Sequence, residues 1–205
     1  MESDDALFAA WRAGARVAGE ELFERHYESV ARFFFNKVGD EGPDLIQRTF
    51  LACVEGRERF RGECGFRSYL FAIAYKVLCK YYDQRRREGQ PIAPAVMAVA
   101  DFSPTPSGLL AARDEQRVLL TALRQLPLEL QVLLELHYWE SLSAEEAAEI
   151  VGIPLGTAKT RIRRGRLLLR EHIAALGSSA AIIRSTLSDL QTWARGIGGL
   201  IGRPT

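Results

Sequence analysis

The sequence predicts an all-α protein of two small helical domains joined by a Pro-rich linker, the second with a helix-turn-helix, plus a C-terminal helical extension. Apolar residues recur at helical spacing, and no strand-like alternation bounded by turn residues occurs. Four of the eight prolines fall between residues 91 and 106, which marks the linker. The predicted boundaries are 1–87, 88–110, 111–176 and 177–205. A chain of 205 residues is long enough for two such domains.

Composition narrows the class of protein. The net charge of +1 gives the whole chain no general attraction for nucleic acid or membranes, so any such attraction must come from local clusters. Cys53, Cys64 and Cys79 form no CxxC pair, which favours the reducing cytoplasm over a disulfide framework. Neither they nor the three histidines have metal-ligand spacing, so no metal or cofactor is expected. The acidic N-terminus resembles no signal peptide, and no run of 18 apolar residues predicts a membrane span.

Three helices are predicted in the N-terminal domain, at about 21–36, 43–58 and 66–87, with glycine-containing breaks between them. The last helix interleaves aromatic side chains with cations. Such a helix can stack on unpaired bases and follow a nucleic-acid backbone, or its aromatic side chains can belong to the core. Core positions are expected at Leu70, Phe71, Ile73 and Val77.

The linker has sparse charge and no helical period, which favours an extended, partly polyproline-like chain. After it, a helix is expected from about Ala111 to Gln125, and Pro127 fits the first position of a second helix. A third helix is expected to begin at Ala144, because Ser143 and Glu146 have capping-box spacing.

A helix-turn-helix is predicted from the turn that follows. Gly152 can adopt the left-handed conformation that ends a helix, and Pro154 prevents that helix from continuing. A new helix then begins near Leu155 and runs to about Leu176. Two helices joined by a short turn containing glycine form this motif.

The second helix of the motif carries a concentrated positive charge. Residues 159–170 contain six basic residues and no acid, whereas residues 112–149 contain three basic and eight acidic residues. A solvated charged face normally mixes both signs at i, i+4. Small and apolar residues recur at 158, 162, 165 and 169, and this stripe is expected to face the core. The outer face therefore predicts binding in a DNA major groove.

Three stretches, "PDLIQRTFLACV", "FRGECGFRSYLFAIAYKV" and "SLSAEEAAEIVGIPLGTAKTRIRRGR", together resemble bacterial sigma factors of the extracytoplasmic-function (ECF) type. The resemblance covers about Leu22 to Leu176 and implies a polymerase-binding domain two and a domain four that reads the minus-35 element. The implied polymerase contacts are Asp44, Leu45, Gln47 and Phe50. The family commonly has an acid where this chain has Arg48.

The resemblance also implies the DNA contacts. A loop before the last helix of domain two captures a flipped base of the minus-10 element, and basic residues after it hold phosphates. The implied minus-10 residues are Arg61, Gly62, Glu63, Cys64, Phe66, Tyr69, Lys76, Lys80, Arg85, Arg86 and Arg87. Tyr69 and Lys76 stand where the family usually has Trp and Asn. The implied minus-35 residues are Thr157, Lys159, Thr160, Arg163, Arg164 and Arg166.

The expected partners are core RNA polymerase and promoter DNA, with an anti-sigma factor as a further candidate, and the free protein is expected to be a cytoplasmic monomer. The linker would thread toward the RNA exit path, as in the family. No catalytic constellation is present in the sequence, so the chain is not expected to be an enzyme. A DNA-binding regulator that does not join polymerase is the alternative function.

The C-terminal extension exceeds the usual length of the family. Apolar residues at helical spacing predict an amphipathic helix, namely Ile183, Leu187, Leu190, Trp193 and Ile197, with regulatory contacts assigned to the first four. Four interpretations are open. The helix docks on one of the two domains and regulates it, binds another protein, lies on a membrane surface, or is a disordered tail.

Overall fold

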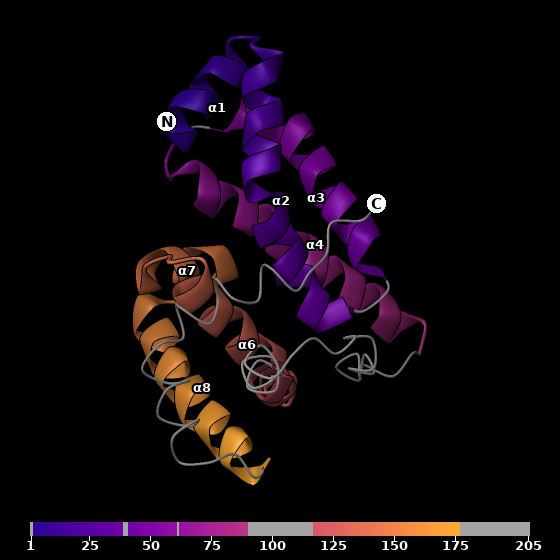
Figure 1. Ribbon diagram of the computed structural model, residues 1–205, viewed down its shortest axis with the longest axis vertical. Helices are drawn as coiled ribbons and strands as arrows, with labels where there is room; N and C mark the ends of the chain where they lie inside the picture. Colours follow the sequence, from indigo (N-terminus) through magenta and orange to yellow (C-terminus); the bar gives the residue numbers. More distant parts are fainter. Residues whose placement is uncertain (1, 39–40, 61, 90–116, 177–205) are drawn as a thin grey trace, which may run out of the picture. The chain divides into compact units, whose positions relative to one another are not determined.

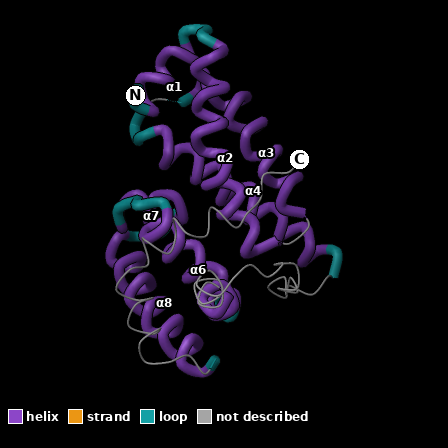
Figure 2. The backbone as a smooth tube through the Cα atoms, viewed as in Figure 1, coloured by secondary structure: helices purple, strands orange, loops and turns teal. Residues whose placement is uncertain are grey.

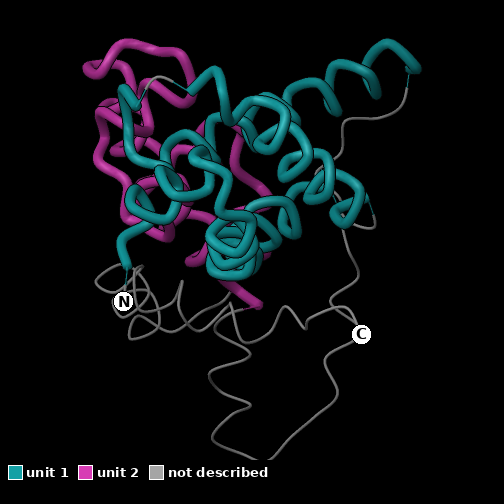
Figure 3. Tube along the Cα trace, turned by 90° about the horizontal axis from the view of Figure 1, so that it is seen from above, with its two compact units in different colours: residues 1–92 teal, residues 93–205 magenta. Residues whose placement is uncertain are grey.

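The computed structural model describes residues 2–38, 41–60, 62–89 and 117–176. The chain divides into two compact units, residues 1–92 and 93–205 (Figure 3). All regular elements of the described residues are helical, which confirms the predicted all-α class (Figure 2). The predicted C-terminal helix and most of the predicted linker lie outside the described residues.

The N-terminal unit is a bundle of α1 (Asp4–Arg12), α2 (Arg16–Val38), α3 (Gly42–Gly56) and α4 (Phe66–Arg87), with a 3₁₀ turn, η2, at Arg57–Arg59 (Figure 1). α2 packs against α1 and α3, and α3 packs against α4. The core is rich in aromatic side chains, and Phe33, Phe34, Phe66 and Phe71 are fully buried in it. This packing holds α3 and α4, which carry the predicted polymerase and minus-10 residues.

Helix α1 was not predicted from the sequence. Ser3 caps it by accepting a hydrogen bond from the Ala6 backbone N–H (3.2 Å), and its buried face carries Leu7, Phe8 and Trp11. The Trp11 indole lies so close to Gly19 of α2 that an added Cβ there would be 2.5 Å from the ring nitrogen. Tertiary packing thus stabilises a helix that is too short to form alone.

The other N-terminal helices agree closely with the prediction. α4 has the predicted bounds, and α3 ends two residues earlier than expected. α2 begins five residues earlier than expected, at Arg16, and is 23 residues long. Of the expected core positions, Leu70 and Phe71 are fully buried, whereas Ile73 and Val77 are only half-buried.

The C-terminal unit contains a helix over residues 117–124, α6 (Leu128–Leu134), a π-helical turn η4 (Glu135–Trp139), α7 (Ala144–Val151) and α8 (Leu155–Ala175). α8 packs on both α6 and α7. Pro127 is the N-cap of α6 rather than its first residue, because its ψ of 135° is extended. The stretch predicted as one regular helix after Pro127 therefore changes to a π turn at Glu135.

Among the residues that the structure describes, no helix has the length and apolar character needed to cross a membrane.

Candidate nucleic-acid interface

The first helix of the motif, α7, begins with a complete capping box. The Ser143 hydroxyl accepts from the Glu146 backbone N–H (3.1 Å), and the Glu146 carboxylate accepts from the Ser143 backbone N–H (2.8 Å). These two bonds satisfy backbone donors that a helix start leaves without partners. The predicted start of α7 at Ala144 is confirmed.

The turn between α7 and α8 depends on Gly152. Its φ of 76° and ψ of 39° are left-handed, and its N–H donates to the Ala148 carbonyl (2.8 Å). The Ile153 N–H donates to the same carbonyl (3.0 Å), which closes the end of α7. Pro154 then caps α8 with extended dihedrals, so the new helix leaves in a new direction. The predicted helix-turn-helix is present.

The inner face of α8 is the predicted one. Ala158, Ile162, Gly165 and Leu169 are all buried. An added Cβ at Gly165 would be 3.2 Å from the Leu134 side chain, so the glycine lets α8 approach α6 closely. This close contact fixes which face of α8 points outward.

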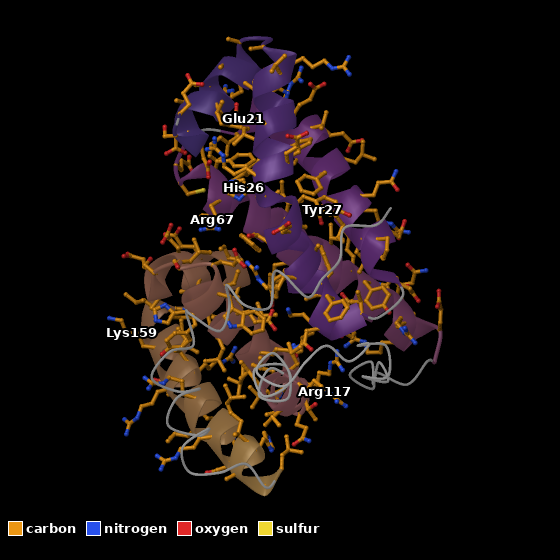
Figure 4. The ribbon with its side chains drawn as sticks, viewed as in Figure 1. Glu21, His26, Tyr27, Arg67, Arg117 and Lys159 are labelled. Carbon is orange, nitrogen blue, oxygen red and sulfur yellow. The ribbon has the colours of Figure 1, made fainter. Side chains whose placement is uncertain are left out.

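The outer face of α8 carries most of the predicted minus-35 residues. Lys159, Thr160, Arg163, Arg164 and Arg166 are exposed, and Thr157 is half-buried. The Lys159 side chain projects away from the body of its unit (Figure 4). The Thr160 hydroxyl donates to the Gly156 carbonyl (2.9 Å), which leaves its oxygen to accept from a ligand.

The charges on this face differ in their pairing. Arg161 is paired, with Nη1 2.6 Å from Oε2 of Glu129 on α6. The Arg166 guanidinium lies 5.8 Å from the Tyr138 ring centroid. Within the described ranges, Lys159, Arg163 and Arg164 have no carboxylate at ion-pair distance. Their positive charge is therefore available to phosphates or guanine edges.

The predicted minus-10 residues of α4 form a second basic surface. Lys76, Lys80 and Arg87 are exposed without an ion pair in the described part of the chain, and Lys76 and Lys80 are one turn apart. Arg86 is paired with Asp83 (3.0 Å). Arg85 is partly buried and donates to the Tyr81 hydroxyl (2.6 Å), a bond that raises the pKa of its guanidinium. Arg85 therefore braces α4, and its charge is paired with Glu41 (3.6 Å).

The loop before α4 places some predicted minus-10 residues at the surface and others inside. Gly62, with a φ of 74°, and Glu63 are exposed, and Cys64 is half-buried. Phe66 is 1% exposed, which corrects its assignment as a base contact: it belongs to the core under the loop. Arg61 lies outside the described residues.

Tyr69 is half-buried against the loop rather than free at the surface. Its ring lies 4.5 Å from that of Phe60, centroid to centroid, and an added Cβ at Gly56 would be 2.5 Å from its hydroxyl. Burial is the main cause that raises the pKa of Tyr69 to about 12. Tyr69 can present only part of its ring to a base in this conformation.

The predicted polymerase residues share α3 but differ in exposure. Asp44 and Gln47 are exposed, and Asp44 is paired with Arg48 (2.8 Å). Phe50 is half-buried, its ring parallel to that of Tyr27 with a centroid separation of 6.3 Å. Leu45 is 1% exposed, which corrects its assignment as a surface contact: it anchors α3 in the core.

Two residues near the loop were missed from the sequence. The Asp5 carboxylate accepts a hydrogen bond from the Phe66 backbone N–H (3.1 Å), and the Phe8 ring contacts Phe60, Phe66 and Tyr69. The sequence signal that could have found them is Ser3 as an N-cap followed by apolar residues at 7, 8 and 11.

Comparison with known proteins gives two family matches. Residues 22–88 match Sigma-70 region 2, and residues 116–169 match Sigma-70 region 4. The chain belongs to the sigma-70 family. The matches take in most of α2, α3 and α4 of this sigma factor in one unit, and the helix-turn-helix in the other, whereas α1 precedes the region 2 match.

Similar proteins identify it as a sigma factor of the ECF type. The ECF RNA polymerase sigma-E factor of Haemophilus influenzae is 28% identical over 183 residues, covering 85% of this chain and 97% of that protein. A structure of CnrH in complex with the cytosolic domain of CnrY has a TM-score of 0.62 and 23% identity, covering 85% and 99% of the chains. The sigma factor RpoE in complex with the anti-sigma factor NepR from Bartonella quintana also has a TM-score of 0.62 and 23% identity, covering 76% and 96%.

Proposed function

We propose that this sigma factor directs core RNA polymerase to specific promoters, reading the minus-35 element with α8 and the minus-10 element with the loop and basic face of α4. One observation carries the proposal. Lys159, Arg163 and Arg164 form an outward face of α8 without paired acids in the described residues, on a helix whose opposite face is buried. A helix held in this way can enter a major groove while its cations meet phosphates and bases.

For the minus-10 element, the surface residues of the loop receive an unpaired base, and the basic face of α4 holds the backbone beside it. Lys76, Lys80 and Arg87 supply the phosphate contacts. Removing a base from the stack costs a few kcal/mol, which contacts in the loop would offset, and this assists promoter melting. Catalysis of RNA synthesis belongs to the polymerase, so the chain itself is not an enzyme.

Core polymerase binds, on this proposal, to the exposed face of α3. Asp44 and Gln47 are three residues apart and both exposed, and Phe50, three residues further along α3, is half-buried. Arg48 pairs with Asp44, so this chain presents a zwitterionic pair where the family commonly has two acids. Arg48 therefore lowers the net negative charge of the α3 surface that would meet the polymerase.

The remaining assignments follow from the sequence. Residues 1–87 act as domain two, 88–110 as the linker, 111–176 as domain four and 177–205 as a regulatory extension. The free protein is a cytoplasmic monomer. An anti-sigma factor is a proposed partner, since one similar structure holds a sigma factor with such a protein.

The proposal is tested by promoter selection and polymerase capture. Reconstituted holoenzyme should select, from random DNA, sequences with two conserved elements. The triple variant Asp44→Ala/Gln47→Ala/Phe50→Ala should remain helical by circular dichroism yet capture much less core polymerase. The matched control, Glu24→Ala/Glu28→Ala, removes two exposed α2 acids and should capture it normally. Normal capture by the triple variant would contradict docking through α3.

A further inference from the structure

The N-terminus of α4 receives its cap from a different helix. Its N-cap residue, Gly65, has no side chain and therefore makes no side-chain cap hydrogen bond. The Phe66 N–H instead donates to Oδ1 of Asp5 on α1, 61 residues earlier, at 3.1 Å. A carboxylate at this place satisfies a backbone donor that would otherwise lack a partner and complements the positive end of the helix.

A single ring of α1 contacts residues on both sides of the loop at residues 61–65. The Phe8 centroid lies 5.0 Å from that of Phe60, which precedes the loop, and 5.2 Å from that of Phe66, which follows it. Tyr69, one turn into α4, lies 6.0 Å from Phe8. Phe8 is 5% exposed, so these contacts are in the core and not on the surface.

Helix α1 is itself fixed to α2, so it can act as a rigid support. Asp4 is 2.7 Å from Nη1 of Arg25 through one oxygen and 2.7 Å from Nε2 of His26 through the other. The Trp11 ring meets that of Phe23 edge to face at 5.2 Å. The two adjacent acids therefore have separate roles: Asp4 anchors α1, and Asp5 reaches α4.

We infer that α1 positions the loop that reads the minus-10 element. Asp5 caps α4 and Phe8 contacts residues on both sides of the loop, so that residues 62–65 are held in the conformation that receives the base. The inference rests on the proposed role of this loop in reading the minus-10 element. α1 lies before the region 2 match, which begins at residue 22. Asp5 is a positioning residue, since it acts through the Phe66 backbone and touches no base.

The test uses holoenzyme and single-stranded oligonucleotides that carry the selected minus-10 sequence, each with one base replaced. Asp5→Ala should reduce the preference for the selected base about three- to tenfold, because the loop then samples other positions. Asp5→Asn keeps an oxygen acceptor and should restore most of the preference. The control Glu24→Ala removes an exposed acid that has no hydrogen bond or ion pair in the described residues, and it should have no effect.

Further readouts separate positioning from stability. Hydrogen exchange should be faster at the Phe66 amide of Asp5→Ala, while its capture of core polymerase and its binding to minus-35 duplex remain unchanged. If Asp5→Ala weakened oligonucleotide binding equally whichever base was replaced, and also captured less core polymerase, α1 would only stabilise the fold and the inference would be overturned. Undiminished base preference in Asp5→Ala would also overturn it. A wild-type protein without base preference would instead contradict the proposed function.

Discussion

Gly152 makes the helix-turn-helix testable without any DNA. Its φ of 76° is unfavourable for a residue with a Cβ, and no atom lies within 4 Å of where that Cβ would be. The cost of Gly152→Ala is therefore conformational and not steric, about 1–2 kcal/mol. Gly156, four residues later, also has nothing within 4 Å, but it lies in α8 and has no positive φ. Gly156→Ala should accordingly stabilise the same unit by at most about 0.5–1 kcal/mol, because Gly156 is only the second residue of α8.

Hydrogen exchange of peptides from α7 and α8 measures the stability changes caused by Gly152→Ala and Gly156→Ala within the full chain. Since 1.4 kcal/mol corresponds to tenfold, Gly152→Ala should speed exchange about 5- to 30-fold, and Gly156→Ala should slow it by at most about two- to fivefold. Gly152→Asn should lie between Gly152→Ala and wild type, because asparagine tolerates the left-handed conformation. Equal exchange in wild type and Gly152→Ala would refute the left-handed turn and the direction of α8 that depends on it.

Three further predictions concern α8, α1 and the C-terminal extension. Arg164→Ala should cost about 1–3 kcal/mol of promoter binding and relax the base preference in the minus-35 element. Arg161→Ala breaks the ion pair with Glu129, so it should lower the stability of the unit and leave the base preference largely intact. Competition binding with altered duplexes distinguishes the two variants. Burial alone would raise the pKa of Asp4, but the hydrogen bond from Arg25 and the charge of His26 outweigh it and lower that pKa. This stabilisation is present above the ordinary pKa of about 3.9 and is lost as pH falls through the folded value, so Asp4→Asn should lower the Tm at pH 7 and differ less from wild type at about pH 3. Deletion of residues 177–205 should change promoter-dependent transcription several-fold without loss of the fold, and unchanged transcription would show that the extension is a mere appendage.

Local signals explain why the helix-turn-helix was predictable. Ser143, Gly152 and Pro154 each act within a few residues of their own position, so the sequence alone indicates where α7 begins, where it ends and where α8 starts. The buried stripe of α8 follows from helical periodicity in the same way. Because the buried stripe identifies the inner face of α8, the opposite face is the outer one, and it carries the candidate minus-35 surface.

Long-range contacts explain what was missed or wrong. α1 depends on Trp11 against Gly19, and Arg161 is paired with Glu129, which is 32 residues earlier in the chain. The Arg161–Glu129 pair leaves no mark in a local window, whereas α1 has a local signal in Ser3 and the apolar residues that follow it. Leu45 and Phe66 were assigned to surfaces through family motifs, yet those motifs combine contact residues with core residues that support them. Contact residues can be separated from core residues only if the burial of each side chain is known. Periodicity predicts that burial only where a helix has one clearly apolar face.

The central claim is that this chain makes core polymerase promoter-specific, and run-off transcription measures it most directly. Core polymerase is assayed with and without the purified chain on a promoter selected by the holoenzyme, and on versions with the minus-10 or minus-35 element replaced. We expect transcripts that require the chain and that fall sharply when either element is replaced. Binding of the free chain to the same DNA, with no transcript from added core polymerase, would contradict it and indicate a regulator that does not join the polymerase.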